Sequence, residues 1–277
     1  MTRTPNFLYV GPDKAGSSWL HEVLLKHPDV YLTPAKDLYF FDRYFDRGLP
    51  WYLSQFRDAG EEKVVGEVCQ DYLFHPEAAK RIHASLGQVK VMVSLRDPVE
   101  RAWSSWLYGR KHGVFAETFG EALAESPELL EHGRYATGLG RFLDLFPRES
   151  IHIALFDDLV ADPQAYLDAV TDFLEVDRMP LDPEDLEARL PAAKARSIRI
   201  ASAVRRGADW VREHDGARIV GYVKRSPLVH RVLYKEIDKQ QTRPDAADVA
   251  AVRAALGSEV DALDRDFGLT LRESWGW

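Results

Sequence analysis

The chain has 277 residues, and its 36 Lys and Arg against 44 Asp and Glu give a formal net charge of −8. A chain of this length can bury a substantial core. The acidic balance argues against general nucleic-acid binding, which needs a basic face, but it allows a local basic pocket for an anionic small molecule. The single cysteine, Cys69, excludes an internal disulfide framework and a zinc site built from cysteines.

The chain shows neither of the usual signals for a membrane or an export route. No apolar run approaches the roughly 20 residues of a membrane-spanning helix, so we expect no membrane partner. The first residues enter a strand-like run at once, without the basic and apolar leader of a secretory signal. We therefore expect a cytoplasmic protein, and the sequence leaves its oligomeric state open.

Short apolar runs alternate with amphipathic stretches over the first 175 or so residues. The runs predict strands at 7–10, 63–68, 89–95 and 151–156. The stretches between them predict helices at 17–27, 76–86, 98–112, 134–146 and 163–174. Strands and helices that alternate at this spacing predict an α/β fold with a P-loop-like parallel β-sheet flanked by helices.

After about residue 177 the pattern becomes mainly helical, with candidate helices at 198–213, 228–235 and 246–267. We interpret residues 1–277 as a single domain, in which a helical extension over 177–277 packs on an α/β core over 1–176. A separate helical domain is the alternative interpretation.

The segment Gly-Pro-Asp-Lys-Ala-Gly-Ser-Ser, residues 11–18, lies between a predicted strand and a predicted helix. Free N–H groups and the dipole at a helix start bind phosphate groups, and Gly16 lets the backbone approach an anion closely. The segment differs from a P-loop by Ser17 in place of the lysine, which stands instead at Lys14. The motif predicts an anion site, and an unoccupied turn with a serine N-cap is the alternative.

Three segments together resemble sulfotransferases, enzymes that use 3′-phosphoadenosine 5′-phosphosulfate (PAPS). Residues 14–20, Lys-Ala-Gly-Ser-Ser-Trp-Leu, resemble the family signature K-x-G-[ST]-[ST]-W-L. Residues 91–104 resemble the family's strand that ends in Arg and is followed by a helix with Ser eight residues later, here Arg96 and Ser104. Residues 146–174 resemble its F-P…E-D-L…D-P…F-L segment. The resemblance covers residues 7 to about 176 and implies that this part is the nucleotide-binding core.

The heparan sulfate branch is the most similar branch. Residues 36–42 resemble its K-E-x-H-F-F-D stretch, and residues 48–52 resemble its G-L-x-W-Y stretch. In that branch the Glu of the first stretch is the proposed base, which implies Asp37 as the base here, with Glu67 as the alternative carboxylate. The branch also has an E-K-T-P-x-Y segment whose lysine lies near the acceptor, and residues 67–72 lack that lysine. His75 is expected to begin a helix rather than to act in catalysis.

The resemblance implies a role for each matching residue in holding the cofactor. Lys14 neutralises the leaving oxygen, while Arg96 and Ser104 hold the 3′-phosphate. The 5′-phosphosulfate is held by Lys14, Ala15, Gly16, Ser17, Ser18 and Trp19. Trp19 stacks on adenine or packs in the core. Arg243 is the candidate from a late basic loop, with the basic run 194–199 as the alternative. The sequence predicts no metal site.

The leading hypothesis is therefore a sulfotransferase that moves a sulfuryl group from PAPS to a hydroxyl of a small-molecule or saccharide acceptor by in-line displacement. A P-loop kinase or NTPase using ATP and magnesium is the alternative, because the strand at 151–156 leads to Asp157 as a candidate magnesium ligand. A non-catalytic nucleotide- or sulfate-binding module is a third. The Arg-, Ala- and Asp-rich composition suggests a role in secondary metabolism.

Overall fold

The computed structural model describes residues 3–187, 193–195, 234–236 and 243–277. Five strands form one sheet in the order β2-β3-β1-β4-β5, with every neighbouring pair parallel. The strands are β1 (Phe7–Gly11), β2 (Val30–Leu32), β3 (Val64–Val68), β4 (Lys90–Leu95) and β5 (Ile151–Leu155). The predicted α/β fold with a parallel sheet is confirmed, and β2 is a strand that the sequence did not predict.

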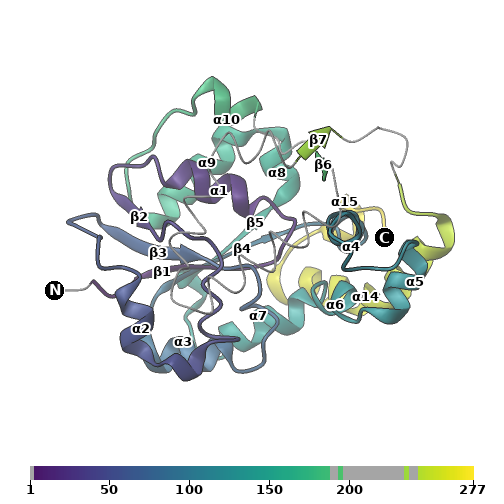
Figure 1. The fold of residues 1–277 in the computed structure, drawn as a ribbon, viewed down its shortest axis with the longest axis horizontal. Helices are drawn as coiled ribbons and strands as arrows, with labels where there is room; N and C mark the ends of the chain where they lie inside the picture. The colour runs from purple at the N-terminus through teal and green to yellow at the C-terminus, as the bar shows by residue number, and fades with distance from the viewer. Residues whose placement is uncertain (1–2, 188–192, 196–233, 237–242) are drawn as a thin grey trace.

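Helices lie on both faces of the sheet (Figure 1). One face carries α1 (Ser17–Leu24), α8 (Phe156–Ala161), α9 (Pro163–Leu174) and α10 (Pro183–Glu187). The other carries α2 (Leu49–Ser54), α3 (Ala78–Leu86) and α7 (Tyr135–Leu143). The remaining helices lie on the right of the view: α4 (Pro98–Lys111), α5 (Phe119–Glu125), α6 (Glu128–Glu131), α14 (Ala246–Phe267) and α15 (Leu271–Ser274). Single 3₁₀ turns occur at Phe45–Arg47 and Arg148–Ser150.

The central strand β1 shows why the sheet is covered on both sides. Successive side chains of a strand point to opposite faces. Phe7 and Tyr9 pack with the apolar residues of α1 and α9, whereas Leu8 and Val10 pack with those of α2, α3 and α7. All four are fully buried, which explains why β1 reads as a continuous apolar run and not as an alternating one.

The C-terminal helix α14 packs against the α/β core. Val260 and Leu263 belong to the apolar cluster on the face of the sheet that carries α2, α3 and α7. Val252 and Leu256 pack with residues of α4. The division of the chain at residue 176 remains a prediction.

The helix expected at 228–235 is wrong at its end, because Tyr234–Glu236 form strand β7, antiparallel to β6 (Ala193–Ala195). Pairing with a distant segment satisfies the backbone groups of β7, and it overrides the local helical pattern. The expected helix at 198–213 and residues 228–233 lie outside the described residues.

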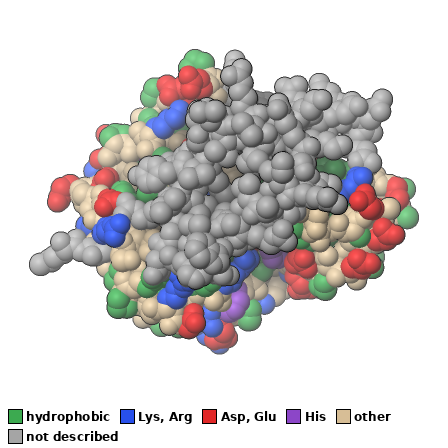
Figure 2. Space-filling view, viewed as in Figure 1, with side chains coloured by type: hydrophobic (Ala, Val, Ile, Leu, Met, Phe, Trp, Pro, Cys, Tyr) green, Lys and Arg blue, Asp and Glu red, His purple; other side chains and the backbone are tan. Residues whose placement is uncertain are grey.

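The described surface carries charges of both signs, as the small net charge indicates. On the face shown in Figure 2, Asp and Glu side chains gather along the right-hand edge, and Lys and Arg side chains are scattered around the margin. Within residues 3–187 and 243–277, no helix is both long and apolar enough to cross a membrane.

Candidate active site

The loop from Gly11 to Ser18 joins β1 to α1 at the carboxyl edge of the sheet. Gly16 is the N-cap of α1 with φ of 87°, a left-handed conformation that favours glycine. A Cβ at this position would lie 2.5 Å from Cδ2 of Leu159, so a larger residue would displace that side chain. No described side chain caps α1, which leaves the first N–H groups of the helix as candidate donors to an anion.

Lys14 lies in this loop with φ of 61° and is tied to the end of β4. Its carbonyl oxygen accepts a hydrogen bond of 3.0 Å from Nη1 of Arg96, and its Nζ lies 4.5 Å from the ring centre of Tyr108. The pKa of Lys14 is lowered to about 8, mainly by burial and also by the nearby charges of Lys36, Arg96 and Arg101, while Asp13 acts in the opposite direction.

Arg96 directly follows β4 and lies across the loop from α1. Its guanidinium lies 4.6 Å from the ring centre of Phe156, and its Nη2 is 3.6 Å from Oε2 of Glu100. Burial is the main cause that lowers the pKa of Arg96 from its usual value. The backbone hydrogen bond to Lys14 uses only one nitrogen, so the planar guanidinium keeps further donors for a phosphate.

Trp19 packs in the core, as the packing alternative expects, and its stacking on adenine remains a prediction. Its side chain is 7% exposed, its ring meets Tyr166 edge-on at 6.0 Å, and its indole N–H donates to the carbonyl oxygen of Asp185 at 2.9 Å. Ser104 lies partly buried on α4, and Arg243 is exposed just before α14. Their roles at the 3′-phosphate remain predictions. Lys194 of the alternative basic run lies in β6, and residues 196–199 lie outside the described part.

Asp37 lies beside the loop, where the segment after β2 passes the end of β3. Its backbone N–H donates to the carbonyl oxygen of Val68 at 2.8 Å, and its Oδ1 accepts a hydrogen bond of 3.2 Å from the N–H of Gln70. The same Oδ1 lies 4.0 Å from Nζ of Lys36, which donates to Oγ of Ser17 at 2.7 Å. The structure therefore connects the candidate base to the loop through Lys36, a residue to which the sequence analysis gave no role.

Glu67 is a core residue, which removes it as the alternative base. It is fully buried, and its Oε1 accepts hydrogen bonds from the hydroxyls of Tyr52 and Tyr72 at 2.9 and 3.0 Å. Burial raises the pKa of Glu67 to about 8, although both tyrosine hydrogen bonds act in the opposite direction. His75 accepts a hydrogen bond from the N–H of Glu77 just before α3, which agrees with the expected role at a helix start.

A buried network beneath the loop was missed by the sequence analysis. Oδ1 of Asp13 accepts hydrogen bonds from Nη1 of Arg101 at 2.9 Å and from Nδ1 of His132 at 3.4 Å, and Oδ2 accepts one from the hydroxyl of Ser105 at 2.9 Å. The Arg101 side chain is completely buried. These partners hold the pKa of Asp13 well below its usual range despite burial. The network fixes the loop to α4. Its only signal in the sequence is that Asp13 and Arg101, which carry opposite charges, lie in the two segments 11–18 and 91–104.

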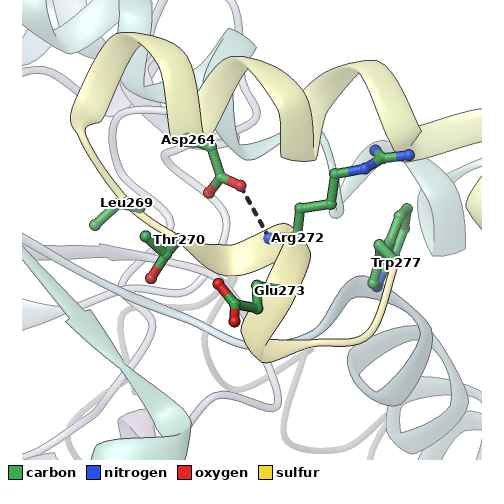
Figure 3. A pocket seen from close by; sticks show the side chains of 6 residues that line it. All are labelled: Asp264, Leu269, Thr270, Arg272, Glu273 and Trp277. Carbon is green, nitrogen blue, oxygen red and sulfur yellow. Dashed lines mark hydrogen bonds between the residues drawn. The ribbon is translucent and has the colours of Figure 1, made fainter.

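The C-terminus forms a small pocket away from the loop (Figure 3). It is lined by Asp264, Leu269, Thr270, Arg272, Glu273 and Trp277, none of which is a predicted site residue. Trp277 also donates its indole N–H to Oδ2 of Asp97 at 2.7 Å, next to Arg96. Within the described residues no group of three or more potential metal ligands lies together.

The profile of the family described as the sulfotransferase domain matches residues 4–207. The chain belongs to the sulfotransferase family. It is 33% identical over 189 residues to human heparan sulfate glucosamine 3-O-sulfotransferase 6, a match that covers 65% of this chain and 55% of that protein. It is 30% identical over 145 residues to membrane-associated sulfotransferase kil1 of Dictyostelium discoideum, which covers 47% of this chain and 31% of that protein.

A solved structure supports the same assignment. The sulfotransferase of Alicyclobacillus acidocaldarius matches with a TM-score of 0.59 and 26% identity, covering 83% of this chain and 99% of that one. This sulfotransferase spans about half or less of the length of the curated relatives just named. Membership of this family does not favour the kinase alternative.

The pKa of Lys14 predicts how nucleotide binding depends on pH. A lysine with its pKa lowered to about 8 is charged below that pH and mostly neutral above it. We expect the affinity for 3′-phosphoadenosine 5′-phosphate to fall by up to about tenfold between about pH 8 and about pH 9, with proton uptake on binding. Calorimetry in buffers of different ionisation enthalpy measures both. Lys14→Met should remove the dependence, and an affinity that is constant over this range would contradict it.

Proposed function

We propose that this sulfotransferase moves the sulfuryl group of PAPS to a hydroxyl of a small-molecule or saccharide acceptor by in-line displacement. The observation that carries the proposal is the set of contacts that gathers the candidate residues. Arg96 donates to the carbonyl oxygen of Lys14, and Lys36 lies between the hydroxyl of Ser17 and the carboxylate of Asp37. A phosphate-binding loop, a cation at its side and a carboxylate thus meet at one edge of the sheet.

The chemistry follows from these positions. The loop N–H groups and Arg96 hold the 5′- and 3′-phosphates, with Ser104 and Arg243 as further candidates. The acceptor oxygen forms a bond to sulfur while the bond from sulfur to the bridging oxygen breaks, and the electron pair remains on the 5′-phosphate of the departing bisphosphate. Lys14 neutralises that oxygen, and Asp37 takes the proton of the acceptor hydroxyl.

The charges around the candidate base Asp37 favour an acceptor that carries little negative charge. Asp71 lies near Asp37, and its Oδ1 has no hydrogen-bond partner among the described residues. The pKa of Asp71 is raised to about 6, mainly by burial and also by Asp37, while His132 and Arg43, which forms an ion pair with Asp71, act in the opposite direction. Valine stands at position 68, where the heparan sulfate branch has its acceptor-side lysine. A hydroxyl on a neutral small molecule or an unsulfated saccharide suits these charges better than a polyanion.

The proposed place of action is the cytoplasm, with a role in secondary metabolism. The only cysteine, Cys69, is buried and free, which suits a reducing compartment. The acceptor class can be identified by incubating the protein and PAPS with a panel of neutral phenols, alcohols and saccharides. Release of the bisphosphate measures the transfer to each compound.

Calorimetric titration without metal tests the cofactor site. We expect 3′-phosphoadenosine 5′-phosphate to bind much more tightly than adenosine 5′-phosphate or ATP. Arg96→Ala should weaken binding of the bisphosphate by roughly 1.5–3 kcal/mol, the range for a hydrogen bond to a charged group. Binding of adenosine 5′-phosphate should change little.

A matched control is Arg178→Ala, because Arg178 forms an exposed ion pair with Asp172 on another part of the surface. Its binding should equal that of the unchanged protein. Binding of ATP that requires magnesium, without preference for a 3′-phosphate, would overturn the proposal.

A further inference from the structure

Lys36 lies at the phosphate loop although it comes from a different part of the chain. The segment after β2 is fixed along β3, since the N–H of Thr33 donates to the carbonyl oxygen of Gly66 and that of Asp37 to Val68. From there Nζ of Lys36 reaches Oγ of Ser17 at 2.7 Å and Oγ of Ser18 at 3.4 Å. Its side chain is only 17% exposed.

The electrostatics of this position point to an anionic ligand. The start of a helix carries partial positive charge and disfavours a cation. Lys36 nevertheless lies at the first turn of α1, and both Lys36 and Arg96 lower the pKa of Lys14. Of the nearby carboxylates, Asp13 is already paired with Arg101, and Asp37 stays 4.0 Å from Nζ of Lys36. Three cations at an uncapped helix start complement a ligand that brings several negative charges.

The place of Lys36 also differs from that of Lys14 along the reaction path. Lys14 belongs to the loop and is bound through its backbone to Arg96, on the nucleotide side. Lys36 has the loop hydroxyls on one side and the candidate base Asp37 on the other. The ammonium of Lys36 therefore lies between the loop and the candidate base.

We propose that Lys36 is a second catalytic cation, which binds the non-bridging oxygens of the sulfuryl group during its transfer. This assignment rests on the proposed function. When PAPS binds, Nζ exchanges the hydroxyls of Ser17 and Ser18 for sulfonate oxygens. Lys36 then stabilises charge on the moving group, while Lys14 stabilises the bridging oxygen that remains on the nucleotide. The same exchange moves Lys36 away from Asp37 and leaves that carboxylate to accept the acceptor proton.

Lys36→Met tests the assignment, because methionine keeps much of the length of the side chain and removes its charge. We expect kcat, measured with PAPS and an acceptor found with the panel proposed above, to fall by about 100-fold, as for the loss of one transition-state donor. Affinity for 3′-phosphoadenosine 5′-phosphate, which lacks the sulfuryl group, should stay within a few-fold of the unchanged protein. Lys36→Arg should restore part of kcat, which a purely structural role would not explain.

Lys90→Met is the matched control, since Lys90 pairs with Glu175 at the start of β4 and should leave kcat unchanged. Unchanged kcat in Lys36→Met would overturn the inference, as would an equal loss of affinity for the bisphosphate, which would make Lys36 a phosphate ligand or a loop support. The proposed function fails separately: in that case the unchanged protein itself neither binds the bisphosphate nor transfers the sulfuryl group.

Discussion

Asp37→Asn should reduce kcat by about 100- to 10,000-fold while leaving bisphosphate binding intact, the range for the loss of a general base. Asparagine is the appropriate substitution because Asp37 has φ of 62°, a left-handed conformation that Asn and Asp adopt more readily than most residues. The amide oxygen of asparagine still accepts the hydrogen bond from the N–H of Gln70, so the turn is kept. The change removes the ability to take a proton, together with the negative charge 4.0 Å from Nζ of Lys36.

The measurement is steady-state turnover at saturating PAPS, accompanied by calorimetry of the bisphosphate with the same variant. Asp29→Asn is the control, because Asp29 forms a partly exposed ion pair with Lys63 before β2. Its kcat should not change. A value for Asp37→Asn within a few-fold of the unchanged protein would exclude Asp37 as the base.

Arg101→Met should lower the free energy of unfolding by about 3–5 kcal/mol, the usual cost of removing one partner from a buried ion pair. The change leaves the carboxylate of Asp13 buried without its main compensating charge, although Ser105 and His132 remain as partners. It also removes the hydrogen bond from Arg101 to the carbonyl oxygen of Leu129. Since Asp13 is part of the phosphate loop, bisphosphate binding should weaken at the same time.

Urea unfolding measures the effect, and its pH dependence gives an independent check. The pair holds the pKa of Asp13 below its unfolded value, so its stabilisation is present above that value and lost as the pH falls. The difference between Arg101→Met and the unchanged protein should therefore shrink below about pH 4. In the double variant with Asp13→Asn, part of the stability should return. A double variant as unstable as the sum of the single changes would contradict the coupling.

The sequence predicts the central part of the fold well because the relevant signals are local. Four strands read as mainly apolar runs, and the structure places both ends of each within one residue of its predicted bounds. Helix α9 matches its prediction of 163–174, since Asp162 caps it and Pro163 begins it. Strand β2 was missed because three residues are too short to show a period. The pairing of β6 with β7 was missed because it joins segments about 40 residues apart.

For the candidate site, the sequence predicts the loop and Arg96, which two separate motifs place at the ends of the neighbouring strands β1 and β4. It does not predict which carboxylate is buried. Glu67 and Asp37 are equally polar in the sequence, but Glu67 lies within β3 and points into the core towards Tyr52 and Tyr72. The contact of Lys36 with Ser17 depends on how a segment outside regular structure runs along β3, and no local pattern encodes that path.

The central place of β1 has a consequence for how the protein is made. Its neighbours β3 and β4 come later in the chain, so the loop after β1 has no finished scaffold until residue 95 has been synthesised. The indole N–H of Trp277 also donates a hydrogen bond to Asp97, which lies 180 positions earlier in the sequence. The surroundings of the loop are therefore completed late in folding, after segments far apart in the sequence have come together.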